Sequence, residues 1–124
     1  MTNKKGLIFI VEDDTQIRDQ LVEVFSGEGF PVKSAENGKV ALDLLKVLDP
    51  LPSLIFLDLM MPVLDGQGFL IELQKKSGRP KWAQIPIVIL SAARHEVNGE
   101  IVRYLRKPPQ LDTLIELAEE HASG

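Results

Sequence analysis

The chain alternates between short, continuous apolar runs and longer stretches in which apolar residues recur at helical spacing. Three compact runs, at residues 7–11, 53–57 and 85–90, are typical of parallel strands that are covered on both faces. Two weaker strands are predicted at 31–35 and 104–106. The pattern therefore predicts five strands along the chain.

Amphipathic helices are predicted between the strands, because apolar residues there recur at intervals of three and four. The first helix is predicted to begin with Thr15 as its N-cap, and the second to follow Asn37. The third follows Asp65–Gly66, and the last carries an apolar stripe from Leu111 to Ala118. We interpret these apolar positions as the core of the protein.

The alternation of strands and helices determines the expected fold class. It implies right-handed crossovers and a doubly wound α/β fold with a parallel sheet. A chain of 124 residues without internal repeats or a long linker is expected to form a single domain over residues 1–124. In doubly wound sheets the functional crevice lies outside the carboxyl ends of the strands.

Polar residues stand at the ends of four predicted strands. Glu12 and Asp13 follow the first strand, Asp58 ends the third, Ser91 ends the fourth and Lys107 ends the fifth. Four separate pieces of chain would therefore deliver these polar groups to the same edge of the sheet.

These residue types suggest phosphoryl chemistry assisted by a metal ion. Carboxylates gathered from two strand ends cannot all stay ionised without a cation, and Mg²⁺ is the natural partner of such hard oxygen ligands. Asp58 is the candidate nucleophile because it ends a central apolar strand, LIFLD, and is rigidly aimed. Lys107 offers a positive charge for a phosphoryl group, and Ser91 offers a hydroxyl.

Composition narrows the possible partners and surroundings. The formal net charge of −4 argues against nucleic acid as the direct ligand, which calls for a basic surface. The chain has no cysteine, so disulfides and thiolate metal sites are excluded and a reducing cytoplasm is compatible. No apolar run approaches the roughly 20 residues that cross a bilayer, and the start MTNKKG has no secretory signal pattern.

The predicted strand ends lie in four segments: IFIVEDDTQIRDQL, LIFLDLMMPVLDG, IVILSA and YLRKP. Taken singly these segments are weakly specific, but in this order they are strongly so. Together they resemble the response-regulator receiver domain of two-component signal transduction, in particular its single-domain, chemotaxis-regulator-like members. The resemblance covers nearly the whole chain and implies a flavodoxin-like receiver fold with five parallel strands.

The resemblance implies a metal site and a phosphoacceptor. Asp58 matches the phosphoacceptor aspartate, and Asp13 matches the direct metal ligand. Glu12 matches the partner of that ligand, which acts through water. Met60 matches the position whose backbone carbonyl completes the Mg²⁺ site.

The resemblance also implies a switch and a set of partners. Ser91 and Lys107 match the pair that contacts the phosphoryl group, and Tyr104 matches the switch aromatic that turns inward with the hydroxyl residue. A histidine kinase or histidine phosphotransfer protein would be the donor in a phosphorelay, and the downstream partner would be another protein. Neither direct binding to nucleic acid nor insertion into a membrane is expected, and the expected location is cytoplasmic.

The chain departs from the family pattern between Ser91 and Lys107. This segment is shorter than usual, so the fourth helix of the family is expected to be shortened or irregular and the output surface altered. Met60 and Ala93 lie two positions beyond Asp58 and Ser91, where polar groups often position a hydrolytic water. Because apolar side chains cannot orient that water, a slowly decaying phosphoaspartate is predicted.

Three alternatives to a stand-alone signalling module remain open. The chain could be a receiver domain from a hybrid histidine kinase, a pseudo-receiver that only binds partners, or an aspartate-nucleophile phosphohydrolase. A pseudo-receiver is expected to have a damaged acid cluster or to lack the lysine, whereas this chain has both the acids and the lysine. Such hydrolases usually carry a second aspartate two residues after the nucleophile, where this chain has Met60. Turnover of an external substrate is therefore not expected. Outside the site, Trp82 is predicted to pack over the end of the third helix, and His95 and His121 are predicted at the surface.

Overall fold

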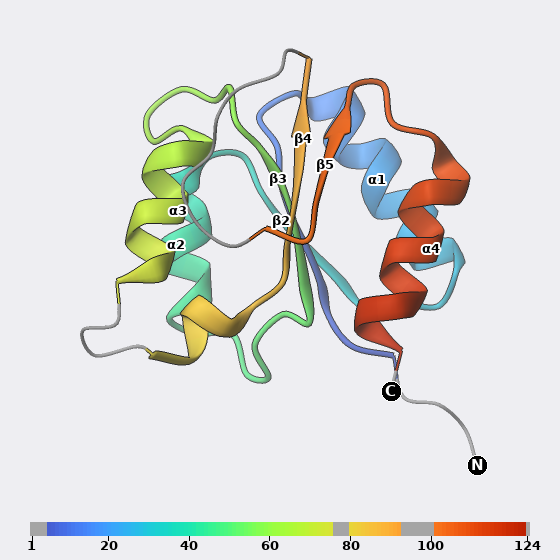
Figure 1. Ribbon diagram of the computed structural model, residues 1–124, viewed down its shortest axis with the longest axis horizontal. Coiled ribbons are helices and arrows are strands. Elements are labelled where there is room, and N and C mark those ends of the chain that lie inside the picture. Colours follow the sequence, from blue (N-terminus) through green and yellow to red (C-terminus); the bar gives the residue numbers. More distant parts are fainter. Residues whose placement is uncertain (1–4, 76–79, 93–100, 124) are drawn as a thin grey trace.

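The structure, a computed structural model, describes residues 5–75, 80–92 and 101–123 of the 124-residue chain. It contains a five-stranded parallel sheet with the strand order β2-β1-β3-β4-β5 (Figure 1). In chain order the strands are β1 (Ile8–Val11), β2 (Val32–Ala35), β3 (Leu54–Asp58), β4 (Ile87–Ser91) and β5 (Arg103–Arg106). The helices are α1 (Thr15–Gly27), α2 (Gly38–Leu45), α3 (Gly66–Gln74) and α4 (Leu111–Ala122), with a short 3₁₀ helix, η1 (Pro80–Gln84).

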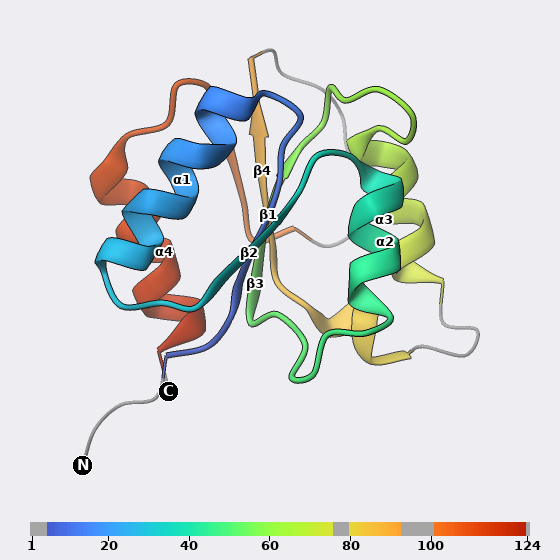
Figure 2. The same cartoon turned by 180° about the vertical axis from the view of Figure 1, so that it is seen from behind.

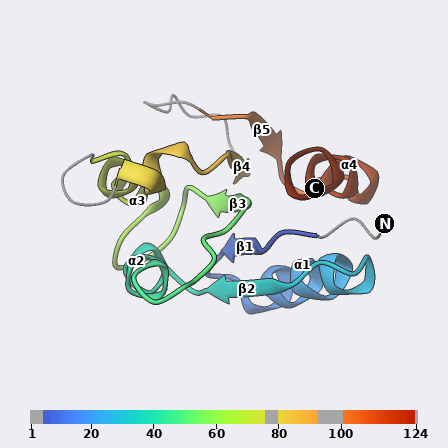
Figure 3. The same cartoon turned by 90° about the horizontal axis from the view of Figure 1, so that it is seen from below.

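The sheet is covered on both faces, which explains why its central strands are apolar throughout. Helices α2 and α3 lie on one face, and α1 and α4 lie on the other (Figures 2 and 3). Alternate side chains of each strand point to opposite faces. Phe9 and Ile55 therefore pack in the cluster with α2 and α3, whereas Ile10 and Phe56 pack in the cluster with α1 and α4.

The strand register brings the carboxyl ends of β1, β3 and β4 to nearly the same level. Val11 pairs with Leu57, so the residues that follow them, Glu12 and Asp58, lie side by side at the edge of the sheet. Asp58 pairs in turn with Leu90, the penultimate residue of β4. The predicted doubly wound, flavodoxin-like fold with a five-stranded parallel sheet is thus confirmed, and each predicted strand lies within two residues of the observed one.

The prediction that Thr15 caps the first helix is wrong. Thr15 is the first residue of α1, and the cap is Asp14, whose Oδ1 accepts a hydrogen bond from the Ile17 amide at 3.1 Å. The predicted cap at Asn37 is confirmed, since its side chain accepts from the Val40 amide at 2.9 Å. Both caps satisfy an amide that has no partner within its helix.

Two further predictions outside the site had different outcomes. Trp82 is buried in the cluster that contains Leu70 and Leu73 of α3, as predicted. The surface position predicted for His121 is wrong, because its side chain is only 24% exposed on α4, which packs against the sheet. The predicted short fourth helix, Ala93 and His95 lie outside the described residues. None of the helices in the described ranges has the length and apolar character required to span a membrane.

Candidate functional site

The turn between β1 and α1 delivers two carboxylates to the edge of the sheet. Glu12 directly follows the buried strand β1 and is itself fully buried, while Asp13 is exposed. The Glu12 amide donates to the Ala35 carbonyl of β2 at 3.0 Å, and the Asp14 amide donates to Glu12 Oε2 at 3.3 Å. These bonds hold the Glu12 carboxylate at the edge of the sheet.

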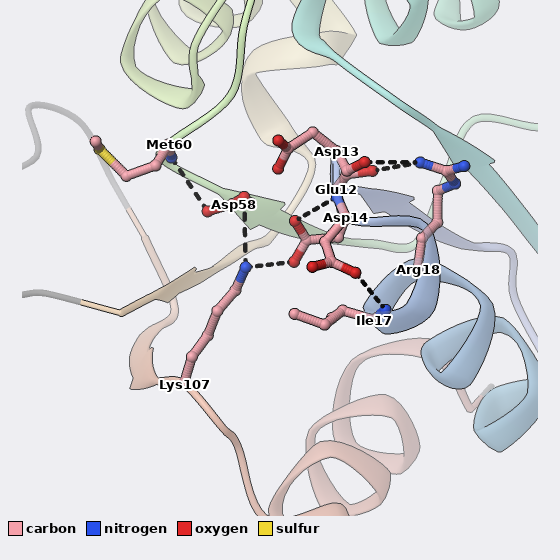
Figure 4. Close-up of polar contacts among 8 residues, drawn as sticks. All are labelled: Glu12, Asp13, Asp14, Ile17, Arg18, Asp58, Met60 and Lys107. Carbon is pink, nitrogen blue, oxygen red and sulfur yellow. Dashed lines mark hydrogen bonds and ion pairs between the residues drawn. The ribbon is translucent and has the colours of Figure 1, made fainter.

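Asp58 is the last residue of the central strand β3 and is only 3% exposed. Its Oδ1 accepts a hydrogen bond from the Met60 amide at 3.1 Å (Figure 4). The chain then turns back so closely that a Cβ atom on Gly66 would lie 2.6 Å from the Asp58 carbonyl oxygen. Only glycine, which has no Cβ, lets the start of α3 pack this tightly behind the candidate nucleophile.

Lys107 reaches the two buried carboxylates from the end of β5. Its Nζ lies 2.5 Å from Glu12 Oε1 and 3.4 Å from Asp58 Oδ2, and its side chain is 16% exposed (Figure 4). The Lys107 amide donates to the Ser91 carbonyl at 2.8 Å, which joins the ends of β5 and β4. Three strand ends therefore meet at one ion-paired group, as the sequence predicted.

Carboxylate oxygens of Glu12, Asp13 and Asp58 lie within 4.8 Å of one another, and we call these three residues the acid cluster. Burial and the neighbouring Asp58 raise the pKa of Glu12 to about 7, and Lys107 offsets this only in part. Burial alone would lower the pKa of Lys107, but its hydrogen bond and ion pair with Glu12, together with the charge of Asp58, raise it above the ordinary value. Burial and the mutual contacts of Glu12, Asp58 and Lys107 thus set the protonation of this cluster.

The remaining predicted site residues lie on β4, on β5 and in the segment after β3. Ser91 is fully buried at the end of β4 and continues the row of Ile87 and Ile89, which pack on the face with α2 and α3. Tyr104 is half-buried on β5, pairs with Ile89 and packs against the same cluster. Met60 contributes its amide to Asp58, and its side chain is 64% exposed.

Arg18 contacts the site but did not emerge from the sequence. It lies in the first turns of α1, and its Nη1 donates to the Glu12 carbonyl at 2.9 Å and to the Asp13 carbonyl at 3.4 Å (Figure 4). Its position four residues after the cap Asp14 is the available signal, because helical side chains lean toward the N-terminus of their helix. A hydrophobic pattern cannot distinguish this arginine from a solvent-exposed one.

The fold and the site together define a class of protein: a doubly wound α/β domain with buried acids and a lysine at the carboxyl edge of its sheet. A family model described as "Response regulator receiver domain" matches residues 8–119, and the chain belongs to this family of two-component signalling. Its resemblance to the family, seen in four sequence segments, is thereby confirmed.

The chain is also similar to individual proteins and to a solved structure. "Probable transcriptional regulator ycf27" of Porphyra purpurea is 39% identical over 92 residues, which are 74% of this chain and 35% of that protein. "Response regulator MprA" of Mycolicibacterium vanbaalenii is 32% identical over 115 residues, covering 87% of this chain and 46% of that protein. A solved CheY-like receiver domain from Methanospirillum hungatei has a TM-score of 0.76 and 28% identity, with 91% of this chain and 90% of that chain covered. The chain spans less than half the length of these two curated relatives.

Proposed function

We propose that this receiver domain accepts a phosphoryl group on Asp58 from a phosphohistidine of a donor protein, and that phosphorylation changes its affinity for a partner protein. One observation carries the proposal: the buried Asp58 carboxylate lies 3.4 Å from Lys107 Nζ and beside Glu12 and Asp13. A carboxylate that is fixed at a strand end and flanked by a fixed cation is well placed to act as a nucleophile.

The proposed transfer is a displacement at phosphorus. A carboxylate oxygen of Asp58 forms a bond to phosphorus while the bond from phosphorus to the donor's imidazole nitrogen breaks. The electron pair of the broken bond stays on that nitrogen, so the donor leaves as histidine and Asp58 becomes an acyl phosphate. Lys107 Nζ lies where it would neutralise charge on the phosphoryl oxygens.

The acid cluster fits a divalent cation, and we propose Mg²⁺. The carboxylates of Glu12, Asp13 and Asp58 would hold it together with the Met60 carbonyl. All of these donors are oxygens, which Mg²⁺ prefers, and the two buried carboxylates of the cluster already pair with the cationic Lys107. When bound, the cation would offset the repulsion between the carboxylates and an incoming phosphoryl group.

Ser91 and Tyr104 are the proposed switch. Both side chains lie on the same face of the sheet, on the neighbouring strands β4 and β5. A movement of Ser91 can therefore change the packing of Tyr104. In the phosphorylated state the Ser91 hydroxyl would donate to a phosphoryl oxygen, and Tyr104 would turn inward. The phosphorylated state would then present a different surface around β5.

The lifetime of the acyl phosphate is expected to be long. The exposed Met60 side chain lies next to Asp58 and has no polar group with which to orient a hydrolytic water. Ala93 is the second apolar residue on which this expectation depends. The half-life measured by intact mass after removal of the phosphodonor should exceed minutes, and decay within seconds would contradict it.

The partners and setting are part of the proposal. A histidine kinase or a histidine phosphotransfer protein would be the donor, and the exchange would take place in the cytoplasm. With a net charge of −4, the domain itself is expected to bind a protein rather than nucleic acid. We propose that residues 1–124 form one receiver domain, whether it acts alone or within a longer protein such as a hybrid kinase.

Incubation with acetyl phosphate and Mg²⁺, followed by intact-mass measurement, tests the proposal. We expect one phosphoryl adduct per chain for the wild type and none for Asp58→Asn. Asp65→Asn is the matched control, because it changes an exposed acid of the same connecting segment whose role is to cap α3. Loss of the adduct in EDTA would support the cation.

The same experiment separates the alternatives. Steady release of phosphate without an accumulating adduct would identify a phosphohydrolase. No adduct and no release would identify a domain that only binds partners. An adduct that persists in Asp58→Asn would place the acceptor elsewhere and overturn the proposal.

A further inference from the structure

The backbone of the turn after β1 is fixed by a side chain from the following helix. After Val11 the chain leaves the sheet, and the Glu12 and Asp13 carbonyls point toward α1 (Figure 4). Arg18 Nη1 donates to both carbonyl oxygens, at 2.9 Å and 3.4 Å. One guanidinium group therefore contacts the backbone of two of the three residues in the acid cluster.

We propose that Arg18 is a positioning residue for the divalent cation: it holds the backbone of Glu12 and Asp13 so that their carboxylates converge with Asp58. This inference deepens the proposed function and rests on it. The backbone of Glu12 is also restrained from the other side, because its amide donates a hydrogen bond to the Ala35 carbonyl. Asp13 is exposed, so the orientation of its carboxylate depends more strongly on how its backbone is held.

The charge of Arg18 and its geometry have opposite consequences for cation affinity. A positive charge near a cation site disfavours binding by Coulomb repulsion, so removing it should raise the affinity for every divalent cation. A group that positions ligands supports binding, so removing it should lower the affinity. The sign of the change therefore shows which effect of Arg18 dominates.

Cation size gives a second criterion. Mg²⁺ requires nearly ideal octahedral geometry at short distances, whereas Ca²⁺ accepts longer and more variable ones. Loosening the turn should therefore weaken Mg²⁺ binding more than Ca²⁺ binding. A change in charge alone would affect both cations in the same direction and to a similar extent.

The test measures the binding of Mg²⁺ and of Ca²⁺ to the metal-free full chain by titration calorimetry. Arg18→Met keeps the length of the side chain and removes its donors; we expect about tenfold weaker Mg²⁺ binding, typical of lost outer-shell partners, and a smaller change for Ca²⁺. Arg18→Lys restores a charged donor and should recover most of the Mg²⁺ affinity. Arg106→Met is the control, since it removes an arginine from an exposed position on β5 at the same edge of the sheet.

Each outcome has a definite meaning. Unchanged or tighter Mg²⁺ binding in Arg18→Met, or equal losses for Mg²⁺ and Ca²⁺, would overturn the positioning role. If Arg18→Met does not fold, Arg18→Gln is judged by the same criteria, with the folded fraction measured in EDTA. Absence of Mg²⁺ binding by the wild type would instead refute the proposed function, so the two failures are distinguishable.

Discussion

Two connecting segments adjoin the site, one carrying Glu12 and Asp13 and the other following Asp58, and they are held in different ways. The first, residues 12–14, joins β1 to α1, and the second, residues 59–65, joins β3 to α3. Each ends in an aspartate N-cap, Asp14 or Asp65, that accepts a hydrogen bond from an amide three residues further on. The same local device thus closes a very short turn and a longer loop.

The two segments differ in the kind of unfavourable interaction that each contains. In the first, the cost is electrostatic, because Glu12 is fully buried beside Asp58 and its pKa is raised to about 7. In the second, the cost is steric: Val63 has φ of +70°, a left-handed conformation that β-branched residues rarely adopt. The start of α3 also lies so close to Asp58 that position 66 has no room for a Cβ. A bound cation can relieve the first cost but not the second. The first turn is therefore suited to respond to a ligand, and the second to hold Asp58 in place.

The largest effect is expected at the steric contact. Gly66→Ala should lower the free energy of unfolding by about 3 kcal/mol, because the new Cβ would meet the backbone of Asp58 and Leu59, which cannot move away like a flexible side chain. Urea denaturation measures this change. Gly27→Ala at the end of α1 is the control; its Cβ meets nothing within 4 Å, so a gain of a few tenths of a kcal/mol is expected. Similar effects at the two glycines would show that the loop is not tightly packed.

The electrostatic cost at Glu12 should make the stability of the protein depend on pH. Native Glu12 binds its proton up to about pH 7, but the unfolded chain releases it near pH 4.5, so the native state holds more protons in this window and loses stability as the pH rises. Between pH 5 and pH 8 the free energy of unfolding of the metal-free wild type should fall by about 2 kcal/mol relative to that of Glu12→Gln. Urea denaturation in EDTA at several pH values checks the slope. If the free energy of unfolding depended on pH in the same way for both proteins, the raised pKa would be contradicted. Added Mg²⁺ should restore the stability of the wild type at pH 8.

Relief of the strained backbone should stabilise the second segment. Val63→Gly should raise the free energy of unfolding by about 1.5 kcal/mol, because glycine adopts positive φ freely and the Val63 side chain, 78% exposed, contributes little burial. Thermal unfolding measures the gain. Val47→Gly is the contrasting variant, since Val47 is 76% exposed without positive φ and should not be stabilised. Equal changes at both valines would show that the backbone at Val63 carries no strain.

The sequence was sufficient to predict the fold and most of the candidate site because both follow from where strands end. The apolar runs are buried on both faces, which sets their length, and parallel strands in register bring their carboxyl ends together. For this reason Glu12 and Lys107, 95 residues apart, could be expected at one edge. The convergence required no knowledge of individual contacts.

Contacts that depend on helix phase or on tertiary packing could not be predicted. Arg18 reaches the turn only because α1 lies with Leu21 and Phe25 against the sheet, which sets its rotation. The positive φ of Val63 opposes the preference of a β-branched residue, so the surrounding structure imposes it. Local propensity contains no information about either feature.

The start of α1 shows the smallest of these ambiguities and can be tested directly. Asp14 and Thr15 are both good N-cap residues, and the structure selects Asp14, whose Oδ1 accepts from the Ile17 amide. Asp14→Ala should therefore cost about 1 kcal/mol, and Asp65→Ala a similar amount in the second segment. Thr15→Ala, at an exposed first helical position, should change stability by less than about 0.5 kcal/mol. Urea denaturation in EDTA keeps cation binding out of the comparison, and a larger loss at Thr15 than at Asp14 would move the helix start by one residue.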